Sequence, residues 1–225
     1  MEIKKYYLIL ILISVLNAES QNYSITLYGI PMADVIIEER DTLYHNQDAV
    51  KIIYKTKTNK ITSNLFKVDN IYETIIEKNT LKILSFQKST FQPNVINHLY
   101  TTYENNVVQY NNSNIIIPEN CFNIFSLLYY LSNNAFASIK NSIILEREGL
   151  IYECKISKFK TNEKTEFELN FNLINDTSNA VIEHTDIFTW ALFKKGSNNK
   201  IVINNSRIES CHFKAGLTNL KASIK

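Results

Sequence analysis

The sequence predicts an all-β protein: one large curved antiparallel sheet that forms a barrel or half-barrel, with one mid-chain α-helix packed on its concave face. Three observations lead to this fold class. Many short segments alternate apolar with polar residues, short polar turns separate them instead of the helices of β-α-β units, and one segment alone has a clear helical period. A sheet of that length must curl or close, and a helix with a wide apolar face needs a sheet to lie against.

Before the helix, the segments 23–28, 33–38 and 50–55 show the alternation of half-buried strands. Lys78-Asn79 and Glu104-Asn105-Asn106 are expected to be hairpin turns. The remaining strands expected in this half are 65–68, 72–76, 81–87, 99–103 and 107–110, and residues 115–117 lead into the helix.

The helix is expected at about residues 120–133. Its main apolar stripe recurs at helical spacing and consists of Cys121, Ile124, Leu128 and Leu131. Asn120 is positioned to cap the first turn, and Asn133 or Asn134 to adopt the left-handed conformation at the end.

After the helix the alternation is sharper, and it is strictest over residues 166–173. The other strands expected in this half are 142–146, 150–156, 187–193, 200–204, 207–213 and 217–224. Because the chain has four glycines, most left-handed turn positions are expected to be occupied by Asn.

Length and composition favour one domain. The 225 residues are 45% hydrophobic, and no stretch rich in Pro, Gly or Ser divides them. Residues 21–225 are therefore expected to form a single β-rich domain. The 24 basic and 22 acidic residues are interspersed and leave a net charge of +2, which argues against nucleic-acid binding.

Residues 1–20 have the pattern of a signal peptide. Lys4-Lys5 precede an apolar run, and small residues then allow cleavage before Gln21 or, as the alternative, after Ala18. The run is shorter than the roughly 20 residues that span a bilayer, and no other stretch is long and apolar enough. We therefore expect an exported protein, periplasmic in a Gram-negative envelope or secreted, with no transmembrane span in the mature chain.

A second row on the predicted helix is the candidate ligand-binding site. It consists of Phe122, Phe125 and Tyr129, which could contact a sugar or a lipid chain. The alternative is that these aromatic residues fill the space between helix and sheet.

No catalytic signature is present: the sequence lacks GxSxG, HExxH, a Walker loop and GxGxxG. We therefore expect no enzymatic activity, no cofactor and no metal site. His184 and Asp186 could form the acid-base pair of a hydrolase, but a solvated loop before a strand containing Trp190 is the preferred interpretation.

The three cysteines are far apart in the sequence. Cys154 and Cys211 both fall in predicted strands and could form a disulfide in an oxidising compartment. The alternative is that these two and Cys121 are small buried hydrophobic residues.

Three segments resemble the motifs of one protein family. They are LYGIPMADV at residues 27–35, FSLLYYL at 125–131 and AGLTNL at 215–220. They resemble the exported bacterial domain-of-unknown-function 3108 family, in which Asp and Arg are usual where this chain has Asn123 and Ser132. The resemblance implies a secreted or periplasmic, β-rich protein without an established activity, so it transfers no catalytic residue to this chain.

The function expected from these observations is that of an exported, non-enzymatic envelope protein that binds an apolar or glycan-like envelope molecule or a protein partner. A periplasmic lipid or lipoprotein carrier with a half-barrel fold is the first alternative. A hydrolase that uses His184 and Asp186 is the second.

Overall fold

The computed structural model describes residues 19–225, apart from 61, 65, 162 and 176–178. Within these residues the chain forms one antiparallel sheet of fourteen strands. The strands are β1 (Glu19–Leu27), β2 (Ile30–Tyr44), β3 (Gln47–Thr58), β4 (Asp69–Glu77), β5 (Ile83–Gln92), β6 (Val95–Glu104), β7 (Val107–Gln109), β8 (Asn114–Ile116), β9 (Ser142–Arg147), β10 (Leu150–Lys160), β11 (Lys164–Leu173), β12 (Asn198–Asn204), β13 (Arg207–Ala215) and β14 (Thr218–Ile224). The predicted single curved antiparallel sheet is confirmed.

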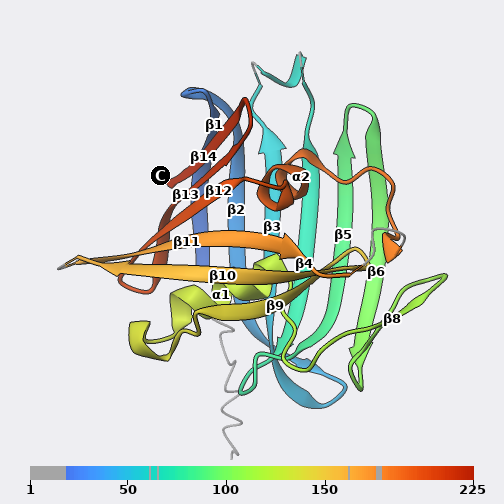
Figure 1. Cartoon of the computed structure of the whole chain (residues 1–225). Helices are drawn as coiled ribbons and strands as arrows, with labels where there is room; N and C mark the ends of the chain where they lie inside the picture. The colour runs from blue at the N-terminus through green and yellow to red at the C-terminus, as the bar shows by residue number, and fades with distance from the viewer. Residues whose placement is uncertain (1–18, 61, 65, 162, 176–178) are drawn as a thin grey trace, which may run out of the picture.

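Two meanders build this sheet. Strands β1 to β8 each pair with the next strand in the chain, and so do β9 to β14. The meanders join where β1 pairs with β14, from Tyr23 opposite Ile224 to Leu27 opposite Leu220. Strands β8 and β9 are the two edges and do not pair with each other, so the sheet is not closed. Figure 1 shows β2 to β6 as one upright wall and β9 to β11 running across it as the other.

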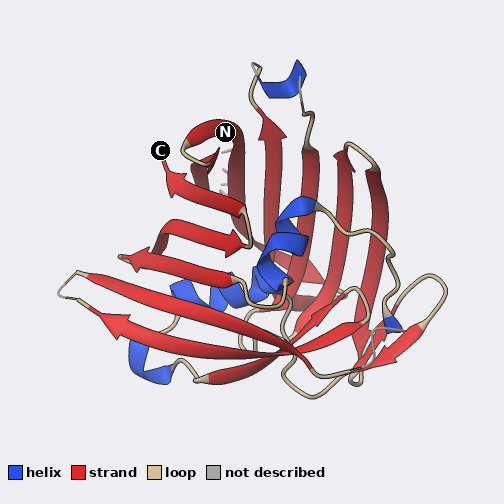
Figure 2. Ribbon diagram, turned by 45° about the horizontal axis from the view of Figure 1, so that its top comes forward, coloured by secondary structure: helices blue, strands red, loops and turns tan. Residues whose placement is uncertain are grey.

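Two α-helices, α1 (Ile124–Asn133) and α2 (Ile187–Phe193), lie between the walls, on the concave side of the sheet (Figures 1 and 2). Two short 3-10 helices, η1 (Thr62–Asn64) and η2 (Phe136–Ser138), lie in connections. The predicted mid-chain helix on the concave face is thus confirmed, but the prediction of a single helix is wrong.

The ends of α1 differ from the prediction. Its N-cap is Asn123, which accepts a hydrogen bond from the Ser126 amide at 2.8 Å, and the Ser126 hydroxyl accepts one from the Asn123 amide at 3.0 Å. Asn120 has a φ of 55° and lies before the helix, so the cap predicted there is wrong. Asn133 is helical and Asn134 is extended, so neither ends the helix in the left-handed conformation.

The second helix replaces a predicted strand at residues 187–193. The Asp186 carboxylate caps it by accepting a hydrogen bond from the Thr189 amide at 2.9 Å. Seven residues rich in β-branched and aromatic side chains are typical of strands. The Asp186 cap and the burial of Thr189, Ala191, Leu192 and Phe193 inside the sheet favour the helix, whereas Trp190 stays exposed. Another predicted strand, 65–68, is also wrong over its described part, because residues 66–68 form a loop.

The turns follow the expectation for a chain poor in glycine. Six of the eleven non-glycine residues with positive φ among those described are asparagines. Asn46, Asn94, Asn105 and Asn205 are four of them, and each lies in a tight hairpin turn.

The disulfide considered for Cys154 and Cys211 is not formed. Cys154 lies on β10 and Cys211 on β13, with two strands between them, and both are buried free thiols. Neighbouring strands are about 4.8 Å apart, so three strand spacings exceed the reach of a disulfide. Cys121 is also buried and free, as in the alternative interpretation.

The predicted signal peptide, residues 1–20, lies outside the described residues except for its last two. Glu19 and Ser20 pair with Glu39 and Glu38 at the start of β1. In the part of the chain that the structure describes, no helix has the length and apolar character needed to cross a membrane.

Candidate functional site

A cluster of aromatic side chains fills the centre of the concave face, where the two helices meet. The buried ring of Phe125 on α1 stacks on Phe86 with 5.8 Å between the ring centroids and lies 4.8 Å from Tyr72. Phe188 on α2 lies 6.3 Å from Phe125 and 5.5 Å from Phe213 on β13. The cluster therefore connects strands of both meanders through the helices.

Two apolar cavities, of about 110 and 60 Å³, adjoin this cluster. They share the lining residues Thr56, Phe188, Phe213 and Ala222, so they lie side by side under α2. The smaller cavity reaches Phe125. A designed apolar cavity of about 150 Å³ binds benzene, so this space can hold a ring or part of an acyl chain.

The larger cavity opens toward the end of the sheet formed by the β1–β2 and β13–β14 turns. Its lining at that end consists of Leu27, Met32, Phe66 and Leu220. The polar side chains in its lining are Thr56, Thr58 and Asn70. An apolar group that enters from this end would meet almost no polar atoms.

The structure does not bring the predicted row Phe122, Phe125 and Tyr129 together. Phe122 precedes α1, and its ring lies 5.3 Å from Tyr130. Tyr129 lies on the side of α1 toward Glu39, where burial and then the charge of Glu39 raise its pKa. Of the three, Phe125 alone lines an apolar cavity described here.

A buried cluster of charges joins the two walls near α2. Lys88 on β5 is 1% exposed, and its Nζ lies 2.5 Å from Glu148 Oε1 and 2.6 Å from Asp186 Oδ2. The same ammonium donates to the Thr185 hydroxyl at 2.9 Å. Because Glu148 lies in the β9–β10 turn and Asp186 caps α2, Lys88 ties three elements together.

The surroundings of Lys88 and Asp186 favour the charged form of each. Burial opposes the charge of Lys88, but the Asp186 and Glu148 carboxylates outweigh it and raise the pKa of Lys88. Burial likewise opposes the charge of Asp186, but Lys88 and hydrogen bonds from Thr189 hold its pKa below the ordinary value. The adjoining cavity is about 20 Å³, room for about one water molecule. The cluster is therefore a clamp between elements and has no space for a substrate.

A second buried carboxylate stands beside this clamp. Tyr103 donates a hydrogen bond to Glu146 at 2.7 Å, Tyr110 donates another, and the Gly149 amide donates a third at 2.8 Å. Burial outweighs these bonds and raises the pKa of Glu146. Glu146 thus holds the β6–β8 edge of one wall against β9 of the other.

The structure separates His184 and Asp186. His184 is exposed, and its Nε2 lies 3.6 Å from Glu183 Oε1. Asp186 is instead buried against Lys88. The loop expected at His184 is confirmed, but Trp190 lies on α2 and not on a strand. The acid-base pair considered for a hydrolase is therefore not assembled in this conformation.

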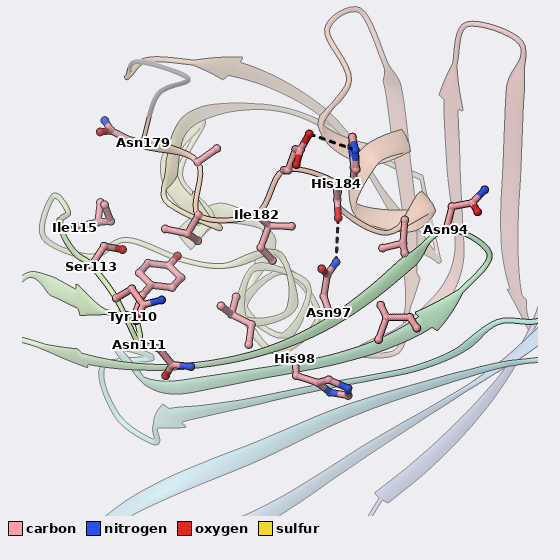
Figure 3. A pocket seen from close by; sticks show the side chains of 17 residues that line it. Asn94, Asn97, His98, Tyr110, Asn111, Ser113, Ile115, Asn179, Ile182 and His184 are labelled. Carbon is pink, nitrogen blue, oxygen red and sulfur yellow. Dashed lines mark hydrogen bonds and ion pairs between the residues drawn. The ribbon is translucent and has the colours of Figure 1, made fainter.

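A polar groove of about 830 Å³ lies between β6, the β7–β8 connection and the segment before α2 (Figure 3). The side-chain amide of Asn97 donates to the backbone oxygen of His184 at 3.0 Å across it. Its polar lining includes Asn94, Asn97, Asn111, Asn112, Ser113, Asn179, Glu183 and His184. The side chain of His98 points away from the groove (Figure 3), and its Nδ1 lies 3.1 Å from Ser89 Oγ. Amides and imidazoles of this kind offer both donors and acceptors, so the groove suits an uncharged ligand rich in hydroxyl or amide groups.

Sequence reasoning missed Lys88, Glu148, Phe188 and the polar groove. The alternation on β5 contained a signal for Lys88, because it places this lysine on the same face as the buried Phe86. No such signal existed for Phe188, whose segment was assigned to a strand. Among the described residues, no group of three or more His, Cys, Asp or Glu side chains is arranged to hold a metal ion.

Comparison with known proteins adds a family and a fold. A family model described as "Protein of unknown function (DUF3108)" matches residues 22–148, more than half of the chain. No curated protein matches the sequence. The crystal structure of a "Beta-barrel-like Protein of Domain of Unknown Function DUF1849 from Brucella abortus" is similar, with a TM-score of 0.53 and 10% identity over 93% of this chain and 96% of that one. At this identity the likeness concerns the fold alone.

Proposed function

The chain belongs to the DUF3108 family of proteins of unknown function, and we propose that it is an exported, non-enzymatic envelope protein that holds an apolar part of an envelope molecule inside its sheet. The observation that carries this proposal is the apolar lining that runs from Leu27 and Met32 at the open end, past Phe188, to Phe125 at the centre. Burial of each additional methylene group in such a space contributes about 0.8 kcal/mol to binding.

Export is supported by the leader-like residues 1–20. Of the two cleavage positions, the one after Ala18 keeps every described residue of β1. Cleavage before Gln21 would remove Glu19, whose carboxylate lies 2.6 Å from the Arg207 guanidinium. We therefore expect the mature chain to begin at Glu19.

The absence of enzymatic activity is supported by the arrangement of the reactive groups. The buried charges around Lys88 satisfy one another next to a cavity of about 20 Å³. His184 lies on the surface, whereas Asp186 is buried, so the two do not form an acid-base pair. Each cysteine thiol is buried, and burial raises the pKa of Cys211 to about 12, which suppresses the reactive thiolate.

The test is to fill the cavity from β14. Ala222 lines both apolar cavities, so Ala222→Phe should place a ring in the space that the ligand would occupy. We expect the wild-type protein to bind a fluorescent fatty acid and Ala222→Phe to bind it at least about tenfold more weakly, a loss of about 1.4 kcal/mol. The measurement is a fluorescence titration of the purified proteins.

The matched control is Ser223→Phe. Ser223 is the next residue on β14, so its side chain points to the opposite face of the sheet. This variant should bind the fatty acid like the wild type. Absence of binding by the wild type, together with no lipid found by native mass spectrometry of the protein purified from its own envelope, would overturn the proposal.

The open sheet favours a more specific version, a lipid or lipoprotein carrier. The two edges β8 and β9 do not pair, so the walls can separate without breaking a strand pair between them. A carrier should accelerate the transfer of a fluorescent lipid between donor and acceptor vesicles. A binding protein that is not a carrier would retain the lipid and leave the transfer rate unchanged.

The polar groove favours a second ligand class, a glycan. Its volume of about 830 Å³ lies within the usual range of small-molecule sites, about 300–1,000 Å³. Asn97→Asp would replace an amide donor by a carboxylate at the centre of this groove. Titration with soluble envelope oligosaccharides, compared between this variant and the wild type, tests the assignment, and equal affinities would count against it.

A further inference from the structure

The open end of the apolar cavity carries exposed apolar side chains. Leu217 in the β13–β14 turn is 90% exposed, Ile30 is 62% exposed, and Tyr28 in the β1–β2 turn is 60% exposed. The two turns lie against each other, because the Tyr28 hydroxyl donates a hydrogen bond to the Leu217 carbonyl oxygen. These turns stand together at the top of Figure 1. Apolar residues at the tips of adjacent turns cost solubility and commonly mark an interaction surface.

Four segments surround this end, and we refer to their described residues as the mouth segments: 26–33, 59–68 without 61 and 65, 187–197 and 214–221. They contain six lysines and no Asp, Glu or Arg, although the whole chain has a net charge of only +2. The lysines are Lys60, Lys67, Lys194, Lys195, Lys214 and Lys221. The mouth segments thus carry positive charge without any acidic residue, whereas basic and acidic residues nearly balance in the whole chain.

The charges and the apolar turns form one surface. Lys194 Nζ lies 4.5 Å from the ring centroid of the exposed Trp190. A Cβ placed on Gly216, the residue before Leu217, would lie 3.4 Å from the same Nζ. Lys194 therefore stands between the indole ring and the β13–β14 turn.

These lysines are not neutralised by carboxylates in the described part of the chain. None of the six is within 4.0 Å of a carboxylate oxygen there. Two acidic residues with exposed side chains lie close to these segments in the sequence, and each pairs with a lysine outside the mouth segments. Asp34 pairs with Lys225 at 2.7 Å, and Asp69 with Lys57 at 3.8 Å. The positive field of the mouth segments is therefore directed to solvent.

We infer that the mouth segments dock the protein on the surface of an anionic phospholipid bilayer. Exposed Leu, Ile, Tyr and Trp side chains enter the boundary between headgroups and acyl chains, and the lysines contact the phosphates. Each lysine near such a surface contributes enough attraction to raise the partition constant roughly fivefold. Docking in this orientation places the cavity opening against the bilayer. The inference rests on the proposed function for its biological meaning, since the bilayer would supply the apolar ligand.

The test is vesicle flotation with two compositions. One set of vesicles is pure phosphatidylcholine, and the other is equal parts phosphatidylcholine and phosphatidylglycerol. We expect the wild-type protein to float with the anionic vesicles, to float far less with the neutral ones, and to be released by high salt. The double variant Lys194→Ala/Lys195→Ala should bind the anionic vesicles roughly thirtyfold more weakly. Leu217→Ser should weaken binding through the loss of apolar contact.

The control with the same loss of charge is Lys82→Ala/Lys155→Ala, because both lysines are exposed and lie outside the mouth segments. This control should float like the wild type. Equal flotation of the two double variants, or no flotation of the wild type, would overturn the inference.

Fatty-acid binding without vesicles separates this inference from the proposed function. If the mouth variants float poorly but bind soluble fatty acid normally, the docking surface is established independently of the cavity. If the wild type floats but binds no fatty acid, the docking surface stands and the proposed apolar cargo fails.

Discussion

The carboxyl group of Glu39 faces the inside of the sheet at the end away from the mouth segments. Its partner across the β1–β2 ladder is Glu19, and both are acidic. Burial and then the charge of Glu19 raise the pKa of Glu39 to about 7. Glu39 is therefore protonated in the folded protein at a pH where the unfolded chain would ionise it.

This shift predicts a pH dependence of stability. A carboxyl whose folded pKa is raised stabilises the fold below its ordinary pKa, and that contribution is lost as the pH rises through about 7. Between pH 5 and pH 8 the wild-type protein should lose about 1–2 kcal/mol of unfolding free energy relative to Glu39→Gln. Urea unfolding of both proteins at the two pH values measures the difference.

Two comparisons sharpen this prediction. Glu38→Gln, on the neighbouring residue whose side chain points to the other face, should not reproduce the change. A chain that begins at Gln21 lacks Glu19 and should show a smaller pH dependence, because the repulsion between the two carboxylates is gone. Parallel pH profiles for the wild type and Glu39→Gln would contradict the assignment.

Single residues also show what the sequence could and could not predict about the site. Phe125 was predicted to lie at the site from its place on an amphipathic helix, and it lines the smaller apolar cavity. Lys88 could not be placed, because its two carboxylate partners lie 60 and 98 residues further along the chain. Such pairs depend on how the walls fold over each other, which no local pattern encodes.

At the scale of elements, the β9–β10 turn is the most constrained connection described. Gly149 has a φ of 87°, and its amide donates to the Glu146 carboxylate at 2.8 Å. A Cβ at this position would overlap the backbone carbonyl oxygen of Asn179. The turn thus needs glycine both for its backbone conformation and for the close approach of the segment before α2.

Gly149→Ala should therefore destabilise the protein by about 3 kcal/mol. The matched control is Gly29→Ala, since Gly29 has a φ of 81° but a Cβ there would meet no atom within 4 Å. Its cost should be about 1 kcal/mol, that of the left-handed conformation alone. Thermal unfolding of both variants measures the two values, and equal losses would show that the contact with Asn179 contributes nothing.

The elements that the sequence predicted well are those whose burial differs between their two faces. Residues 166–173 alternate strictly and form most of β11, with Phe167, Leu169 and Phe171 buried. The segment 187–193 has few polar residues, and even its exposed residue Trp190 is apolar. Its sequence therefore shows neither the helical nor the strand alternation of apolar and polar residues. The sequence contained a signal for this helix, because Asp186 is a favourable N-cap residue, but Asp186 was interpreted as part of a loop.

At the scale of the whole molecule, the pairing of β1 with β14 holds the two meanders in one sheet. The two strands belong to opposite ends of the described chain, and five residue pairs connect them. Tyr23 reinforces this seam, because its hydroxyl donates to the backbone oxygen of Ile208 on β13 at 2.7 Å. Contacts this distant in sequence form late and slowly during folding, so the seam should control whether the halves assemble.

Proline at the seam tests its importance. Ser24 pairs with Asp34 on one side and Ser223 on the other, so a proline there removes a hydrogen bond from an interior strand. Ser24→Pro should lower the unfolding free energy by more than about 3 kcal/mol. Fluorescence of Trp190, the single tryptophan of the chain, reports the transition in urea, because α2 lies between the two walls.

Ile116→Pro is the matched substitution at an edge. Ile116 lies on the edge strand β8 and is 82% exposed. The Ser113 carbonyl oxygen accepts a hydrogen bond from the Tyr110 amide, and the Ile117 amide donates one to the Asn106 carbonyl oxygen. Because successive residues of a strand direct their backbone groups to opposite sides, the amide of Ile116 points away from the preceding strand. This variant should lose less than about 1 kcal/mol. If the two proline variants unfolded at the same urea concentration, β1–β14 pairing would not couple the two halves. The stability of each wall would then come from its own meander and from the helices between the walls.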